Sequence, residues 1–173
     1  MKLVIAPDDF LERKVSTFDY SNLDPLSTSH NMGVLMNTSG GLGLAANQVS
    51  IDAQIFVMRP VLNKTNAIAG VITVINPEIK AISEEVDSGV EGCLSYPGVF
   101  LSVKRPRKIL VEFDTLTPDG NNVIHVGQVF EDIDARIFLH EYDHLTGVQF
   151  IDRVSALKRN MAVKKVLKHK RRN

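Results

Sequence analysis

The sequence has one cysteine, no tryptophan and no long apolar run, and each of these absences narrows the kind of protein it encodes. A single cysteine cannot build a disulfide framework, so we expect a protein of a reducing compartment, the cytoplasm. The longest apolar stretches, such as residues 69–75, are too short to cross a bilayer, so no membrane partner is expected. The short apolar N-terminus stops at Pro7 and acids follow it, unlike a signal peptide. A processed organellar form stays open, because a removed transit peptide leaves no trace.

Net charge is absent overall, but the charges are unevenly distributed along the 173 residues. Eight of the 20 Lys and Arg residues lie from Lys158 onward, whereas all 20 Asp and Glu residues precede that position. The length, with 44% hydrophobic residues, fits a single domain. We therefore expect an acidic catalytic body over residues 1–155 and a basic C-terminal helix or tail over residues 156–173.

Apolar and turn-forming residues predict a mixture of helices and strands. Asp24-Pro25 is typical of a helix start, and we expect that helix to reach Asn37. Asn76-Pro77 is expected to end a strand, and residues 92–98 are expected to form a loop. Strands are predicted over residues 54–58, 71–75, 99–103 and 108–113, and over 122–130 as a returning hairpin strand, with a strand or irregular arm over 79–90.

The segment HEYDH over residues 140–144 is the strongest chemical signal in the chain. On a helix, His140 and His144 point to the same side one turn apart, so both imidazoles can meet one metal ion. Glu141 lies beside the first histidine, where a carboxylate can take a proton from activated water. Acidic residues before this segment and Gly147 after it predict the two ends of the helix. Two surface histidines on an amphipathic helix are the alternative, because a catalytic site needs a third ligand.

Both completions typical of HExxH metalloproteases are missing from the sequence. No Glu follows Glu141, and the position three residues after Gly147 is Phe150 instead of His. Cys93 is the best remaining ligand, because a thiolate and two imidazoles leave a fourth position open for water. Asp152 is a second carboxylate candidate, although its surroundings are typical of a short structural segment.

Three segments together resemble the ordered motifs of peptide deformylases. They are GLGLAANQ over residues 41–48, EGCLS over residues 91–95 and HEYDH, and the similarity extends from PDDFL near the N-terminus to FIDR over residues 150–153. The resemblance implies an α+β fold in which small antiparallel or mixed sheets wrap around a central HExxH helix, followed by a C-terminal helix. It also implies a hydrolase that removes the formyl group from the N-terminal formyl-methionine of nascent polypeptides.

The resemblance further implies roles for individual residues. One divalent metal ion per chain is held by Cys93, His140 and His144; in the family it is usually Fe²⁺, with Zn²⁺, Ni²⁺ or Co²⁺ as substitutes. Glu141 is the general base and acid that moves a proton between hydroxide-forming water and the departing amine. The side-chain amide of Gln48 and the backbone N–H of Leu94 donate to the oxyanion. The substrate is flanked or enclosed by Leu42, Gly43, Glu91, Gly92 and Ile137.

Two positions depart from the family pattern, and two other functions compete. Leu139 precedes the first histidine where the family often has Gln, and Phe100 lies where some members have a basic residue that contacts substrate. In some members a C-terminal helix docks on the ribosome; residues 158–172 have a suitable charge for rRNA, although a solvated terminus is the alternative. A metallopeptidase lacks its third ligand here, and a non-catalytic ribosome-associated protein conflicts with the presence of every catalytic residue. Bacterial, phage and organellar origins all stay open.

Overall fold

The computed structural model describes residues 1–61 and 70–170 of the 173-residue chain. Three helices, three 3-10 turns and seven strands are assigned in these residues, in the order η1 (Asp9–Glu12), α1 (Pro25–Thr38), β1 (Gly43–Ala45), η2 (Ala46–Val49), β2 (Ile55–Met58), β3 (Ile72–Ile82), β4 (Val86–Cys93), β5 (Tyr96–Pro106), β6 (Lys108–Leu116), β7 (Val123–Glu131), α2 (Asp132–Leu145), η3 (Phe150–Arg153) and α3 (Ala156–Lys170). Of these, no helix is both long and apolar enough to span a membrane.

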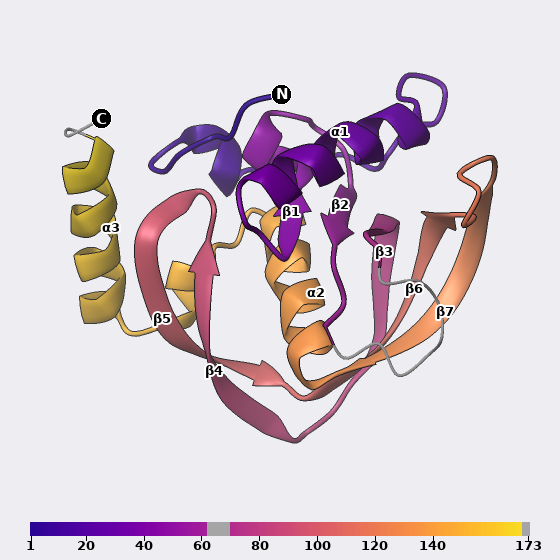
Figure 1. Ribbon diagram of the computed structural model, residues 1–173. Coiled ribbons are helices and arrows are strands. Elements are labelled where there is room, and N and C mark those ends of the chain that lie inside the picture. The colour runs from indigo at the N-terminus through magenta and orange to yellow at the C-terminus, as the bar shows by residue number, and fades with distance from the viewer. Residues whose placement is uncertain (62–69, 171–173) are drawn as a thin grey trace.

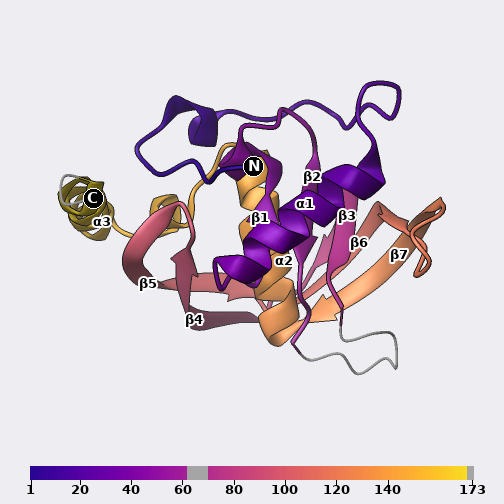
Figure 2. The same ribbon diagram turned by 45° about the horizontal axis from the view of Figure 1, so that its top comes forward.

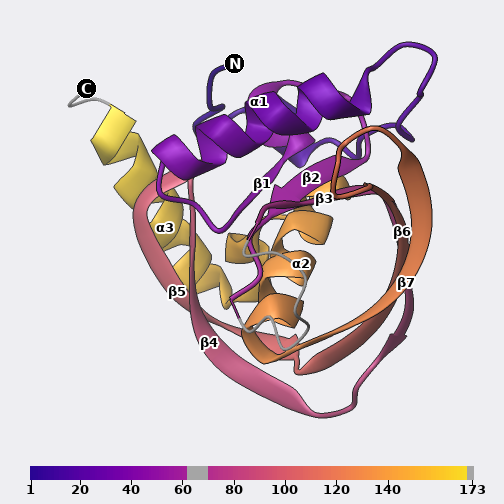
Figure 3. The ribbon, with the colours of Figure 1, turned by 45° about the vertical axis from the view of Figure 1, so that its right-hand side comes forward.

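The strands form two antiparallel sheets that curve around α2 (Figures 1 and 3). One sheet has five strands in the order β1-β2-β3-β6-β7, and the other is the hairpin of β4 and β5. Helix α1 lies across β1 and β2, and α3 lies outside the sheets beside β5 (Figure 2). The predicted α+β fold, with small sheets around a central helix and a C-terminal helix, is confirmed.

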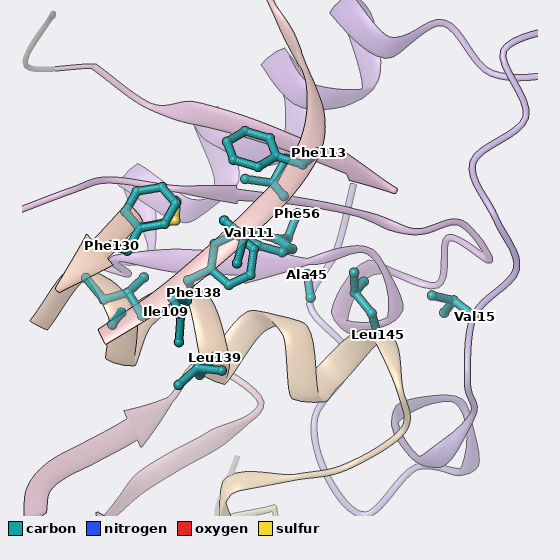
Figure 4. Close-up of a cluster of buried hydrophobic side chains, with 14 residues drawn as sticks. Val15, Ala45, Phe56, Ile109, Val111, Phe113, Phe130, Phe138, Leu139 and Leu145 are labelled. Atoms are coloured by element: carbon teal, nitrogen blue, oxygen red, sulfur yellow. The ribbon is translucent and has the colours of Figure 1, made fainter. Parts of the chain in front are cut away.

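The central position of α2 follows from the apolar contacts on one of its sides (Figure 4). Phe138 is fully buried, and its ring centroid lies 5.1 Å from that of Phe56 in β2 and 5.4 Å from that of Phe130 in β7. Full burial of such a side chain contributes about 1.5–3 kcal/mol. Residues two positions apart lie about 200° apart around a helix. Burial of Phe138 against the five-stranded sheet therefore turns His140 toward the opposite side.

The predicted ends of both helices agree with the structure. Helix α1 begins at Pro25, and the carboxylate of Asp24 caps it by accepting a hydrogen bond from the Ser27 N–H at 2.8 Å. Helix α2 ends at Leu145, shortly before Gly147, which has a φ of +77°. A Cβ at position 147 would lie 2.5 Å from the backbone oxygen of Glu12, so both the dihedral and the close approach require glycine.

The prediction that Asn76-Pro77 ends a strand is wrong, because β3 continues through it to Ile82. The strand is instead bent at this point by an irregularity: Asn76 has a φ of +48°, and the pairing with β6 shifts register between Ile75 and Glu78. The Asn76 side chain stabilises the bend by accepting from the Phe18 N–H at 2.7 Å. A β-bulge can accommodate the missing backbone N–H of Pro77, whereas a regular ladder would lose a hydrogen bond at that position.

The predicted loop over residues 92–98 is also wrong for most of its length. Gly92 and Cys93 belong to β4, β5 begins at Tyr96, and only Leu94 and Ser95 form the turn between them. The pairing shifts register between Gly92 and Cys93, and that irregularity accompanies the tight turn. Cys93 is therefore carried by a paired strand, which holds its position more firmly than a loop would.

Helix α3 packs on the rest of the protein through a narrow apolar stripe. Ala162 and Val166 are buried in a cluster with Val99 and Val103 of β5 and Phe150 of η3. Most other residues of α3, including its lysines and arginine, are exposed. The helix thus presents a basic outer surface, although Arg171 and Arg172 of the predicted tail lie outside the described residues.

Candidate metal centre and active site

Cys93, His140 and His144 meet at one point, as the sequence predicted. Cys93 comes from the end of β4 and both histidines come from α2, and their ligand atoms all lie within 4.8 Å of one another. The Cys93 Sγ atom lies 3.3 Å from His144 Nε2. In the described residues this is the one group of three or more His, Cys, Asp or Glu side chains with metal-binding geometry.

Glu91 holds His140 in the orientation that a ligand needs. Its Oε2 lies 2.9 Å from His140 Nδ1, which leaves Nε2 of that ring for the centre. The carboxylate is buried, and Arg105 donates to both of its oxygens at 2.9 Å. Burial by itself raises the pKa of Glu91, but the hydrogen bonds from Arg105 and His140 outweigh it and hold that pKa well below its usual range. Glu91 therefore stays ionised. A metal-ligating histidine usually has such a partner on its other nitrogen.

The two imidazoles have opposite electrostatic surroundings. Burial and the neighbouring His140 push the pKa of His144 well below its usual range, so this ring is neutral and has a free lone pair for a metal. Burial also lowers the pKa of His140, but hydrogen bonding with Cys93 and Glu91 raises it well above the usual value. The surroundings of His140 thus favour positive charge at this point, as those of a metal site do.

Glu141 directly follows His140 on α2. It is 4% exposed, and its Oε2 is buried without a hydrogen-bond partner in the described part of the chain. Burial raises the pKa of Glu141 to about 7. Gly43 of β1 lies directly against it, because a Cβ at position 43 would overlap the carboxylate. The buried, unpaired oxygen has the character of a group that exchanges protons with a bound molecule.

Gln48 brings an amide to the cysteine ligand. Its Nε2 lies 3.3 Å from Cys93 Sγ and donates to Ser95 Oγ at 3.1 Å, while its Oε1 accepts from the Ala45 N–H at 2.8 Å. The short η2 turn that carries Gln48 is tied to the end of α2, because Asn47 donates to the His144 backbone oxygen at 2.6 Å. The first sequence motif is thereby fixed against the other two.

The predicted substrate-binding residues lie around the centre on different elements. Leu42 is exposed just before β1, and Gly43 is in β1. Gly92 is in β4, and Ile137 lies one turn before Glu141 on α2, where it is buried. The strands β1 and β4 each pair with a single other strand within the described residues.

The Leu94 backbone follows Cys93 in the turn, and the Leu94 side chain lies against the first motif. A Cβ at Gly41 would come within 2.8 Å of Leu94 Cδ1. Asp152, the second carboxylate candidate, is instead exposed on η3, where it accepts from Arg159 at 2.7 Å. It is not part of the metal-binding group.

Sequence reasoning missed the buried ionic residues behind the ligands. Arg136 donates to Glu91 Oε1 at 2.9 Å, and Arg105 links Glu91 to Asp143. These side chains come from β4, β5 and α2, so no local pattern reveals them. The acidic residue two positions before Cys93 was the available signal, since a ligating histidine needs an anion behind it.

The two positions that depart from the family pattern, Leu139 and Phe100, have different surroundings in the structure. The Leu139 side chain packs in the core cluster beside α2, and its backbone oxygen accepts from Arg105 Nη1 at 3.4 Å. Phe100 is 69% exposed and pairs with Gly92, over which its ring lies. At position 139, apolar packing of the leucine side chain thus stands where a glutamine would bring a polar group.

The donor set fits a divalent transition metal. One thiol and two imidazoles at a shared point supply three ligands, and the neutral state of His144 suits coordination. Glu141, whose buried Oε2 lacks a hydrogen-bond partner among the described residues, directly follows His140 on α2. Three protein ligands together with a nearby buried carboxylate are typical of catalytic metal centres.

Comparisons with known proteins agree with this geometry. The family model for polypeptide deformylase matches residues 1–160. A peptide deformylase of Borreliella burgdorferi is 36% identical over 98% of this chain and 97% of that protein, and one of Thermotoga petrophila is 38% identical over 90% of this chain and 85% of that protein. The crystal structure of the Ehrlichia chaffeensis peptide deformylase in complex with actinonin has a TM-score of 0.83 and 34% identity, and the match covers 99% of this chain and 98% of that one. The chain therefore belongs to the peptide deformylase family of metal-dependent enzymes.

Proposed function

We propose that this chain removes the formyl group from the N-terminal formyl-methionine of nascent polypeptides, with Cys93, His140 and His144 as ligands of the metal. The observation that carries the proposal is the meeting of these three side chains beside the buried carboxylate of Glu141. The reaction consumes one water: its oxygen bonds to the formyl carbon, the C–N bond breaks, and formate and a free amine leave. The metal, when bound, polarises the reactants and makes water more acidic.

Glu141 moves the proton in this scheme. Its carboxylate takes a proton from water and delivers it to the nitrogen of the departing amine. Burial, which raises the pKa of Glu141 to about 7, makes this group a ready proton carrier near neutral pH, although a nearby divalent cation favours its ionised form. The close packing of Gly43 fixes the position of the carboxylate during both transfers.

Gln48 and Leu94 stabilise the oxyanion in this proposal. The Gln48 Nε2 atom lies 3.3 Å from Cys93 Sγ, so its N–H groups would be available to an oxyanion that forms next to this cysteine. The backbone N–H of Leu94 directly follows the cysteine ligand in the β-turn. Loss of one such donor costs on the order of a hundredfold in rate.

The peptide lies between two strand edges in this proposal. Leu42 and Gly43 line it on the β1 side, and Glu91 and Gly92 line it through their backbone on the β4 side. Ile137 and Leu42 enclose the methionine side chain. The Glu91 side chain takes no part in this contact, because its carboxylate is occupied by His140 and the two arginines.

A formate-release assay on formyl-Met-Ala-Ser tests the proposal. Wild-type protein with Fe²⁺ under anaerobic conditions, or with Ni²⁺, Co²⁺ or Zn²⁺, should release formate and should leave acetyl-Met-Ala-Ser intact. Glu141→Gln should abolish release with metal retained, whereas Cys93→Ala should abolish it through loss of metal. Activity that persists in Glu141→Gln would contradict the proton-transfer role, and cleavage of internal peptide bonds would favour a metallopeptidase. Metal analysis of the anaerobically purified protein identifies the resident ion, for which we propose Fe²⁺.

The basic surface of α3 supports a second proposal, that residues 158–172 bind rRNA in the cytoplasm beside the catalytic body of residues 1–155. Most of the lysines and arginine of α3 are exposed, and rRNA would attract them with a strong dependence on salt. Ribosome pelleting with the full chain and with a chain lacking residues 158–173 measures this directly. Equal binding of both forms across salt concentrations would contradict the tail proposal and leave the enzyme assignment untouched.

A further inference from the structure

Arg153 on η3 is a half-exposed member of the ionic network behind the proposed metal site. The network runs from His140 to Glu91, from Glu91 to Arg105, and from Arg105 to Asp143. Arg153 closes it, because its Nε donates to Asp143 Oδ2 at 3.0 Å and its Nη2 donates to Asp143 Oδ1. The side chains of Arg105 and Asp143 are 3% and 6% exposed, whereas that of Arg153 is 46% exposed.

We infer that Arg153 is a positioning residue for the metal ligand His140, and that it acts through Asp143, Arg105 and Glu91. This inference rests on the proposed metal site. Asp143 lies between the two histidine ligands in α2, and it receives hydrogen bonds from two guanidinium groups at once. Each arginine therefore limits how far the Asp143 carboxylate can shift toward the other arginine.

Arg105 connects Asp143 to Glu91, so it transmits the effect of Arg153 on Asp143 to Glu91. It binds Glu91 through Nε and Nη2, and it uses Nη1 for Asp143 and the Leu139 backbone oxygen. Without Arg153, Asp143 would be a buried carboxylate with a single cationic partner, and the attraction between Asp143 and Arg105 would rise. The guanidinium is rigid and planar, so any shift toward Asp143 turns the fork that holds Glu91. The Glu91 carboxylate would then release its firm hold on His140 Nδ1.

The network contains three carboxylates and three guanidinium groups. The carboxylates are Glu91, Asp143 and the exposed Asp87, whose Oδ2 lies 3.6 Å from Arg136 Nη2, and the guanidinium groups are Arg105, Arg136 and Arg153. Arg136 is bound to Glu91, the Val103 backbone oxygen and the Asp87 backbone oxygen, so it cannot substitute for Arg153 at Asp143. Among the described residues, Arg153 is thus the only cation besides Arg105 that is bonded to Asp143.

Arg153→Met tests the inference, with Arg153→Lys as the conservative variant and Arg159→Met as the matched control. Arg159 is also an arginine near the start of the C-terminal segment, it is 49% exposed, and it pairs with Asp152 outside the network. Its proposed contact with rRNA takes no part in metal loss or in formate release from a free formyl-Met-Ala-Ser peptide. The measurement is the rate at which Ni²⁺-loaded protein loses its metal to EDTA, followed by the absorbance of the Ni²⁺–thiolate bond. Formate release supplies kcat and KM, and thermal unfolding of the metal-free proteins reports stability.

We expect Arg153→Met to lose Ni²⁺ about three- to tenfold faster, which is less than the ten- to hundredfold typical of a group that holds a ligand directly. Its kcat should fall while KM stays near the wild-type value, Arg153→Lys should recover part of the loss, and Arg159→Met should match wild type. An unchanged rate of Ni²⁺ loss in Arg153→Met would overturn the inference, as would an equal effect in Arg159→Met. Wild-type protein that fails to bind Ni²⁺ or to release formate would instead overturn the proposed function.

Discussion

The contact between Gly43 and Glu141 yields a sharp prediction for the substitution Gly43→Ala. The added Cβ would lie 2.6 Å from Cδ and 2.7 Å from Cγ of Glu141, and the three atoms nearest to it all belong to that side chain. Carbon atoms in contact lie about 3.5–4.0 Å apart, so Glu141 would have to move by about 1 Å. The Glu141 side chain is buried, so this movement would take its carboxylate away from the position that the proposed proton transfer requires.

A displacement of about 1 Å at a reacting group costs on the order of a hundredfold in rate. We therefore expect kcat for formyl-Met-Ala-Ser to fall about a hundredfold in Gly43→Ala, because proton transfer depends on the position of Glu141. Metal content, measured on the purified protein, should remain at the wild-type level, because the three atoms nearest to the new methyl group all belong to Glu141.

Gly127→Ala is the matched control for this substitution. Gly127 belongs to β7 of the same five-stranded sheet, and the atom nearest to a Cβ there is Glu112 Cγ at an ordinary 3.8 Å. Its kcat should equal that of wild type. If Gly43→Ala keeps a kcat within about threefold of wild type with metal bound, the reasoning about Glu141 is wrong. Loss of metal in Gly43→Ala would refute it as well, because the damage would then lie at the ligands.

Three further substitutions test stability and metal retention. Glu91→Gln leaves Arg105 and Arg136 without their buried anion, so the free energy of unfolding in urea should fall by about 3–5 kcal/mol; an unchanged denaturation midpoint would contradict the burial of this pair. The same variant should bind Ni²⁺ about 10–100-fold more weakly in a chelator competition, whereas equal affinity would mean that Glu91 does not orient His140. Gly147→Ala places a side chain at a φ of +77° and against the Glu12 backbone. The free energy of unfolding should therefore fall by about 2 kcal/mol or more, and Tm measured by calorimetry should fall by several degrees. An unchanged Tm would show that the turn relaxes freely. Phe138→Ala should lower the free energy of unfolding by about 3–5 kcal/mol in the same urea titration, and a loss under about 1 kcal/mol would mean that the helix is not held by this ring.

The clustering of Cys93, His140 and His144 could be predicted because each belongs to a short motif with its own chemical logic. His140 and His144 share a helix, so their spacing alone places both rings on one side. Cys93 completes the set by elimination of other ligands, and the structure brings it within 3.3 Å of His144 Nε2. The helix boundaries at Pro25 and Gly147 were equally local, since each depends on the dihedral preferences of one residue.

The parts that sequence reasoning missed depend on contacts between distant segments. Arg105 and Arg136 are ordinary charged residues in the sequence, and only the fold buries them around Glu91. The continuation of β3 past Pro77 depends on pairing with β6 and on the Asn76 side chain, which holds the backbone of Phe18 from far away in the sequence. Local turn propensity lost to tertiary pairing at that bulge.

The wide separation of the site residues along the chain has a consequence for folding. The contact of Gln48 with Cys93 spans 45 residues, that of Cys93 with His144 spans 51, and that of Asn47 with His144 spans 97. Contacts of this kind require loop closure before they yield any stabilisation, so they form slowly and late. Cys93, His140 and His144 cannot meet before α2, which is followed only by η3 and α3, has been synthesised and packed. If these side chains hold the metal as proposed, metal capture is coupled to completion of the fold, and a partly made chain has no preformed site for the ion.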